Sequence, residues 1–258
     1  MISFEAAGSG PVLILIEPAG HYRGLSAFDE LVPLLTPDLT VCRYDRRGRG
    51  ASGDTPPYAP DREVEDLAAL LDAFGGRAFG YGYSSGALLA LHAAARGVPL
   101  AGLVLMEPPL QDGIQDVPDP LTEQLDELVK ANLNEDAVEL FHTAIGVPDE
   151  VIVDMRCTDR WTRMVGVAPT LVYDCQLSDA MGPEVLGAVS VPTLILDSDG
   201  SSDDLTGSAA SAARHIPGAR HRSLPGEWHV VAPDLIAAEI KSFCDCHGQV
   251  GANEGECS

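Results

Sequence analysis

The feature that most constrains the fold is the pentapeptide Gly82-Tyr83-Ser84-Ser85-Gly86, which lies between two apolar segments. Residues 78–81 before it are typical of a short strand, and residues 87–95 after it are typical of a buried helix. A serine at a tight turn between a strand and a helix has a strained backbone and a projecting hydroxyl. The flanking glycines would let the strand and the helix approach closely. The pattern predicts an α/β fold in which Ser84 is a nucleophile beside the positive end of a helix.

The same segment also imitates a dinucleotide-binding fingerprint. A G-x-G-x-x-G pattern would begin at Gly80, and the acidic residue Glu107 follows the next predicted strand. Ser85 stands where the third glycine should be, and a dinucleotide-binding unit does not account for the chain upstream. The nucleophile interpretation is therefore favoured.

Apolar runs and helical stripes alternate along most of the chain. Strands are predicted at residues 2–6, 12–16, 40–44, 78–83, 103–106, 193–196 and 221–224, and helices at residues 27–35, 62–74, 87–95 and 235–243. Buried strands that alternate with helices favour a mainly parallel sheet with helices on both faces.

Residues 110–188 interrupt this alternation with several helical patterns and little strand signal. Asn134 is expected to N-cap one of these helices, and Pro148 to begin another. The segment predicts a helical cap inserted between core strands, with Phe141, Trp161 and Tyr173 lining a substrate cavity beneath it. The expected organisation is a core in two parts (residues 1–109 and 189–247), the cap (110–188) and a disordered tail (248–258).

Composition restricts the partners and the setting. A net charge of −23 excludes nucleic acid and anionic membrane as main partners. No apolar run is long enough for a transmembrane helix, and the first residues lack the basic region of a signal peptide. The six cysteines are scattered, which predicts no disulfide framework and a reducing, cytoplasmic setting. The C-x-C-H run at residues 244–247 lacks the usual zinc spacing, so no metal site is expected there. No cofactor is expected either. The amino-acid composition is typical of a bacterial gene.

Together, the order of these elements and four motifs resemble the α/β-hydrolase superfamily. Residues 82–86 look like its nucleophile elbow, and residues 17–20 (Glu-Pro-Ala-Gly) stand where that family has its His-Gly oxyanion loop. Residues 45–52 are similar to the loop after the family's next strand, and residues 224–229 look like the late loop that carries its histidine. The resemblance covers the chain apart from the tail, and it implies the α/β-hydrolase fold with a helical cap.

The resemblance also implies roles for particular residues. His229 would be the general base, and the backbone N–H groups of Ser85 and Ala19 would form the oxyanion hole. Pro18 has no N–H and replaces the family's glycine, so it cannot be a donor. His21 and Tyr83 are expected near the substrate, and the arginines of residues 45–52 are expected to hold a loop in place.

The acid that would orient His229 is less clearly marked. The family commonly places it a few residues beyond the strand after the cap, a position that falls near Ser201 in this chain. Asp197 and Asp199 come too early for that position. The superfamily's other location is the end of the strand after the nucleophile helix, where Glu107 stands. We favour Glu107 and keep Asp199 and Asp197 as alternatives.

The function implied is that of a serine hydrolase of the carboxylesterase or thioesterase type. It would cleave an ester or thioester of a small or medium organic substrate through an acyl-enzyme. Aspartate-nucleophile chemistry is disfavoured by Ser84. The alternatives are a non-hydrolytic lyase or cyclase on this fold and a ligand-binding protein on the same scaffold. The only partner predicted is a small-molecule substrate, and a homodimer is left open.

Overall fold

The structure, a computed structural model, describes residues 1–110 and 120–248 and contains a seven-stranded sheet. The strands are β1 (Phe4–Ala7), β2 (Val12–Ile16), β3 (Thr40–Tyr44), β4 (Ala78–Tyr83), β5 (Leu100–Met106), β6 (Thr193–Ser198) and β7 (Arg220–Leu224). They lie in the order β1-β3-β2-β4-β5-β6-β7. Only β1 at the edge is antiparallel to its neighbour among these seven, so the predicted mainly parallel sheet is confirmed.

Helices cover both faces of this sheet because its central strands are apolar on both sides. Along β2, Leu13 and Leu15 pack into the core beneath α1 (Val32–Leu35) and α11 (Pro233–Gly248). The intervening Ile14 and Ile16 pack into the opposite core, beneath α2 (Pro60–Ala73) and α3 (Ser85–Ala95). The helix α10 (Asp203–His215) lies on this second side as well, as its buried residues show. The fold is thus the α/β-hydrolase fold that the motifs predict.

One predicted core helix is much shorter than expected. The apolar spacing predicts a helix over residues 27–35, but the structure has only α1 (Val32–Leu35). The chain before α1 is fixed to a buried carboxylate instead, because the Ser26 hydroxyl and the Ala27 N–H both donate to Glu17. A tertiary contact therefore overrides the local helical pattern.

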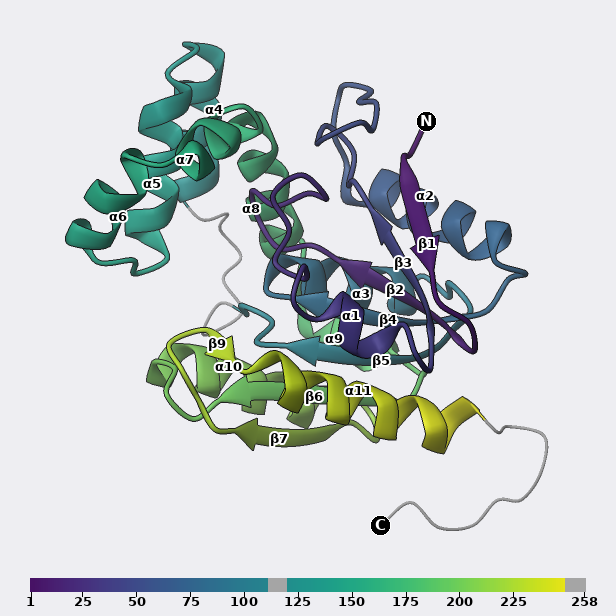
Figure 1. Cartoon of the computed structure of the whole chain (residues 1–258). Helices are drawn as coiled ribbons and strands as arrows, with labels where there is room; N and C mark the ends of the chain where they lie inside the picture. The colour runs from purple at the N-terminus through teal and green to yellow at the C-terminus, as the bar shows by residue number, and fades with distance from the viewer. Residues whose placement is uncertain (111–119, 249–258) are drawn as a thin grey trace.

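The insertion between β5 and β6 is helical, as predicted. It comprises α4 (Pro120–Lys130), α5 (Asn134–Ala144), α6 (Asp149–Arg156), α7 (Asp159–Val165), the 3-10 turn η1 (Ala168–Thr170), α8 (Leu171–Asp179) and α9 (Pro183–Ala188). Figure 1 shows α4 to α7 gathered on one side of the molecule, with α8 leading back to the sheet. These helices share an apolar core of their own, which includes Leu125, Val138 and Trp161. The capping prediction is wrong in detail, because Leu133 is the N-cap of α5 and Asn134 is its first residue.

The C-terminal region differs from two expectations. Gly248, predicted as the start of the tail, ends α11, and the rest of the predicted tail (249–258) lies outside the described residues. Cys246 is disulfide-bonded, a bond that the scattered positions of the cysteines did not indicate. No helix in the described part of the chain is both long and apolar enough to cross a membrane.

Candidate active site

Ser84 lies at the turn between β4 and α3, where its backbone adopts φ 53° and ψ −122°. This left-handed conformation is unfavourable for a residue with a side chain and persists because the surrounding contacts impose it. The Ser84 N–H is held by the Met106 carbonyl at 2.9 Å. A Cβ at position 82 would lie 2.6 Å from the Ala87 Cα, and one at position 86 would lie 2.2 Å from the Ile16 oxygen. Both glycines are therefore required by close packing, as predicted.

His229 lies at the tip of a small antiparallel hairpin formed by β8 (Gly226–Glu227) and β9 (Val230–Val231). It is the second residue of the two-residue connection and has φ 55°, a conformation that suits a tight turn. A hydrogen bond from the core strand β4 holds the backbone of His229, because the hydroxyl of Tyr83 donates to the His229 carbonyl. The residue next to Ser84 thus fixes the main chain of His229.

The structure brings Glu107, and neither aspartate, to the ring of His229. Glu107 follows β5, is fully buried, and its Oε2 is hydrogen-bonded to Nδ1 of His229. Its Oε1 accepts from the Ser198 N–H at 2.8 Å and from the Ser201 hydroxyl at 2.6 Å. Burial alone would raise the pKa of Glu107, but the hydrogen bonds from His229, Ser198 and Ser201 outweigh it, so the pKa lies below its ordinary value. The carboxylate is therefore charged at neutral pH.

Both alternative acids have other partners. Asp197 Oδ2 lies 2.6 Å from Nε2 of His221, on the neighbouring strand β7. Asp199 Oδ1 accepts from the Gly226 N–H at 3.0 Å, in the hairpin that carries His229. Asp199 thus supports the histidine loop without touching the ring, and the catalytic role of Glu107 stays a prediction.

The loop after β2 turns its carbonyl groups away from the cavity. The guanidinium of Arg46 donates to the Glu17 carbonyl at 3.3 Å, and that of Arg49 donates to the Pro18 carbonyl at 2.7 Å. The Ala19 carbonyl lies 2.7 Å from Nδ1 of His21. Burial lowers the pKa of His21 to about 4, so its ring is neutral at pH 7 and donates from Nδ1. The N–H groups of Ala19 and Ser85 have no hydrogen-bond partner among the described residues, as oxyanion donors require.

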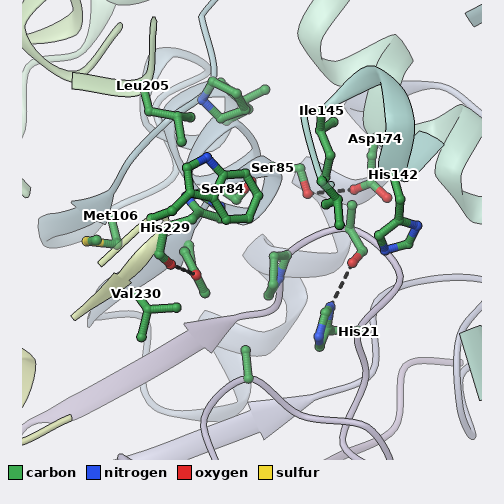
Figure 2. A pocket seen from close by; sticks show the side chains of 18 of the residues that line it. His21, Ser84, Ser85, Met106, His142, Ile145, Asp174, Leu205, His229 and Val230 are labelled. Carbon is green, nitrogen blue, oxygen red and sulfur yellow. Dashed lines mark hydrogen bonds between the residues drawn. The ribbon is translucent and has the colours of Figure 1, made fainter. Parts of the chain in front are cut away.

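One cavity of about 990 Å³ lies between the sheet and the helical insertion, and it is bordered by Ala19, His21, Ser84, Ser85 and His229. Figure 2 shows Ser84, Ser85 and His229 close together, with His21 and His142 across the cavity from His229. No hydrogen bond joins the Ser84 hydroxyl to the His229 ring in the described contacts, although such contacts often tighten only when substrate binds. Most of the lining is apolar, so an acyl or alkyl group can be buried beside Ser84.

The expected substrate-lining residues divide into two groups. His21, Tyr83 and Phe141 line the cavity. Trp161 does not, because it is buried inside the insertion, where the guanidinium of Arg156 lies 5.3 Å from its ring. Tyr173 does not either, since its ring stacks on Tyr58 at 4.0 Å. The predictions for Trp161 and Tyr173 are therefore wrong.

The comparisons with known proteins agree with this geometry. The model of the Alpha/beta hydrolase family matches residues 7–239. The chain belongs to this family. A solved structure, an alpha/beta hydrolase from Sphaerobacter thermophilus DSM 20745, is 41% identical, superposes with a TM-score of 0.85, and is matched over 94% of this chain and 95% of its own.

Two further similarities are more limited. A pimeloyl-[acyl-carrier protein] methyl ester esterase from Xylella fastidiosa (strain M12) is 36% identical over 103 residues, which cover 40% of this chain and only 38% of that protein. A thermophilic esterase from Thermogutta terrifontis shares the fold, with a TM-score of 0.73 at 23% identity over 95% of this chain and 94% of that chain. The family is thus shown by the match over residues 7–239, and the curated esterase is matched over less than half of its own length.

A buried charge network in this alpha/beta hydrolase joins the insertion to the core, and no sequence motif marks its central residue, Asp174. Asp174, on α8, accepts from Arg46 at 2.7 Å, from Arg49 and from the Ser85 hydroxyl at 2.8 Å. Burial would raise the pKa of Asp174, but the two guanidinium groups outweigh it and lower the pKa. Since Arg46 and Arg49 also hold the loop after β2, one network positions both candidate oxyanion donors. The structural role predicted for the arginines of residues 45–52 agrees with these contacts.

We expect Glu17 to make the stability of this alpha/beta hydrolase depend on pH. Burial raises its pKa from 4.5 to about 7, and the side chain is only 1% exposed. A carboxyl group whose pKa is raised in the folded chain binds a proton there that the unfolded chain releases. Its contribution to stability is complete below pH 4.5 and is lost as pH rises through about 7. That loss is on the order of 3 kcal/mol.

We therefore expect Glu17→Gln to be more favourable at pH 8 than at pH 5, because the amide stays neutral at both. Denaturant unfolding at the two pH values measures the difference in the free energy of unfolding between variant and wild type. Glu65→Gln, a change at an exposed carboxylate on α2, is the matched control. Parallel pH dependences for Glu17→Gln and wild type would contradict this account.

Proposed function

We propose that this chain is a serine hydrolase that cleaves an ester or thioester through an acyl-enzyme. One observation carries the proposal: Ser84, at a strained strand-to-helix turn, shares a cavity with His229, whose ring is bonded to the buried Glu107. A nucleophile, a base and a carboxylate that orients the base are the groups that acyl transfer needs.

The proposed reaction uses these groups in two steps. The Ser84 oxygen attacks the substrate carbonyl while Nε2 of His229 takes the hydroxyl proton, and the Ser85 and Ala19 N–H groups stabilise the oxyanion. The alcohol or thiol leaves with the proton from His229, and the acyl group stays on Ser84. Water then attacks the acyl-enzyme with His229 again as base, which releases the acid and restores Ser84.

The setting supports an organic substrate of small to medium size. The cavity of about 990 Å³ is mostly apolar and includes Phe28, Tyr81 and Trp228. The similarity to a methyl ester esterase also favours an ester, although that match covers only 38% of the relative.

A fluorophosphonate probe tests the proposal, because it reacts with a serine hydroxyl only when a neighbouring base activates it. Intact mass should increase by one phosphonyl group, and peptide mapping should place it on Ser84. Prior incubation with an ester substrate should slow the labelling. No labelling, or labelling elsewhere, would contradict the proposal and favour a non-hydrolytic or binding function.

A further inference from the structure

The last residue of β6 and the short segment after it hold the histidine hairpin at three points. The Ser198 hydroxyl donates to the Glu227 carbonyl at 2.6 Å, and Asp199 accepts from the Gly226 N–H at 3.0 Å. The Ser201 hydroxyl accepts from the His229 N–H at 2.9 Å. The hairpin is thus fixed by side chains of residues 198–201, in addition to the pairing of β8 with β9.

Ser201 differs from Ser198 and Asp199 because its side chain also reaches the acid, to which Ser198 donates only through its backbone N–H. Its proton goes to Oε1 of Glu107 at 2.6 Å, while its lone pair takes the backbone N–H of His229. One oxygen atom therefore joins the carboxylate to the main chain of the histidine that this carboxylate orients. Ser201 also stands where the superfamily commonly places the acid itself.

We propose that Ser201 is a positioning residue for the proposed reaction. Its hydroxyl orients the Glu107 carboxylate toward the His229 ring and holds the backbone of His229 in place. This inference rests on the proposed function. The hydroxyl donates to one carboxylate oxygen, so the other oxygen is directed at Nδ1 of His229. Its hold on the His229 N–H fixes a residue whose positive φ is unfavourable without such support.

Tyr83 provides a comparison because it holds the other side of the same residue. Its hydroxyl donates to the His229 carbonyl but does not contact Glu107 among the described hydrogen bonds. Ser201→Ala removes a hold on the backbone of His229 and a donor to Glu107, whereas Tyr83→Phe removes only a hold on the backbone. The two variants therefore separate the effects of backbone support from those of carboxylate support.

The groups around His229 determine the expected pH dependence. Several titratable or charged side chains lie around His229 and its hairpin. Glu107 and Tyr83 contact His229 itself, and Asp199 contacts the hairpin. Glu227 belongs to the hairpin, and Arg160 lies near Tyr83. Glu107 alone among these bonds to the ring. Without the Ser201 donor, the carboxylate has one hydrogen bond fewer and holds the imidazolium more strongly.

The test measures ester hydrolysis and NMR spectra of wild type, Ser201→Ala, Ser201→Thr and Tyr83→Phe. We expect kcat of Ser201→Ala to fall about 10- to 100-fold, the size of one lost hydrogen bond to a charged group. The acid limb of its kcat/KM profile should move to higher pH, and the low-field proton resonance of His229 Nδ1 should shift. Ser201→Thr should keep the wild-type limb, while Tyr83→Phe should lower kcat without moving the limb. Ser202→Ala, at the exposed neighbouring serine, is the matched control.

The outcomes separate this inference from the proposed function. An equal loss of activity at all pH values with an unchanged resonance would show a merely structural role and overturn the inference, as would wild-type behaviour of Ser201→Ala. A shifted resonance in a chain that hydrolyses no ester would support the positioning role and contradict the proposed function.

Discussion

Ser84→Ala is expected to lower the rate of ester hydrolysis by about 10⁴- to 10⁶-fold, because loss of the nucleophile in serine hydrolases has effects of this size. The Ser84 hydroxyl makes no hydrogen bond among the described contacts, so its removal should leave the fold intact. Hydrolysis of short p-nitrophenyl esters gives the rate, and the thermal unfolding midpoint shows whether the variant is folded.

Ser202→Ala provides the matched control, since it removes the same hydroxyl from an exposed serine. That variant should retain the wild-type rate and the wild-type unfolding midpoint. If Ser84→Ala retained most of its activity, another residue would have to be the nucleophile.

The pattern of the core could be predicted from sequence because it depends on local chemistry. Buried parallel strands are continuous apolar runs, and β2 and β5 consist of such residues. The turn at Ser84 could be predicted because only glycine tolerates the contacts at positions 82 and 86. In the buried strands and at this turn, the backbone geometry allows few residue types, so the residue types indicate the geometry.

The parts that sequence did not predict depend on contacts between distant residues. Phe141 and Trp161 are both aromatic residues of the insertion, yet only Phe141 faces the cavity. Helical spacing cannot distinguish them, because which helical face meets the cavity is set by the packing of the insertion. Asp174 pairs with an arginine 128 positions away, and nothing in the local sequence marks that pairing.

The lack of a carboxylate at position 201 helped to identify the acid that orients His229. A hydroxyl at the position where the family commonly has its acid implied that the carboxylate comes from elsewhere, and it favoured Glu107. In the structure, that hydroxyl and Glu107 are hydrogen-bonded to each other. The sequence could indicate which acid approaches His229, but not that Ser201 would contact both members of the pair.

Glu107→Gln is expected to lower kcat by about 10³- to 10⁴-fold, with a much smaller effect on stability. An amide can still accept one hydrogen bond, but its NH₂ group then meets a donor, either Nδ1 of His229 or the Ser198 N–H and Ser201 hydroxyl. The histidine ring loses the charge that stabilises its protonated form and the partner that fixes its tautomer. Steady-state kinetics give kcat, and thermal unfolding shows that the variant is folded.

Asp197→Asn and Asp199→Asn are the matched comparisons, because each makes the same change at a carboxylate on the neighbouring strand or just after it. Asp197 lies against His221, and Asp199 supports Gly226, so neither contacts the His229 ring. Each should therefore reduce kcat far less than Glu107→Gln. A larger loss in either aspartate variant than in Glu107→Gln would assign the acid to that aspartate, and the buried carboxylate after β5 would then have a structural role.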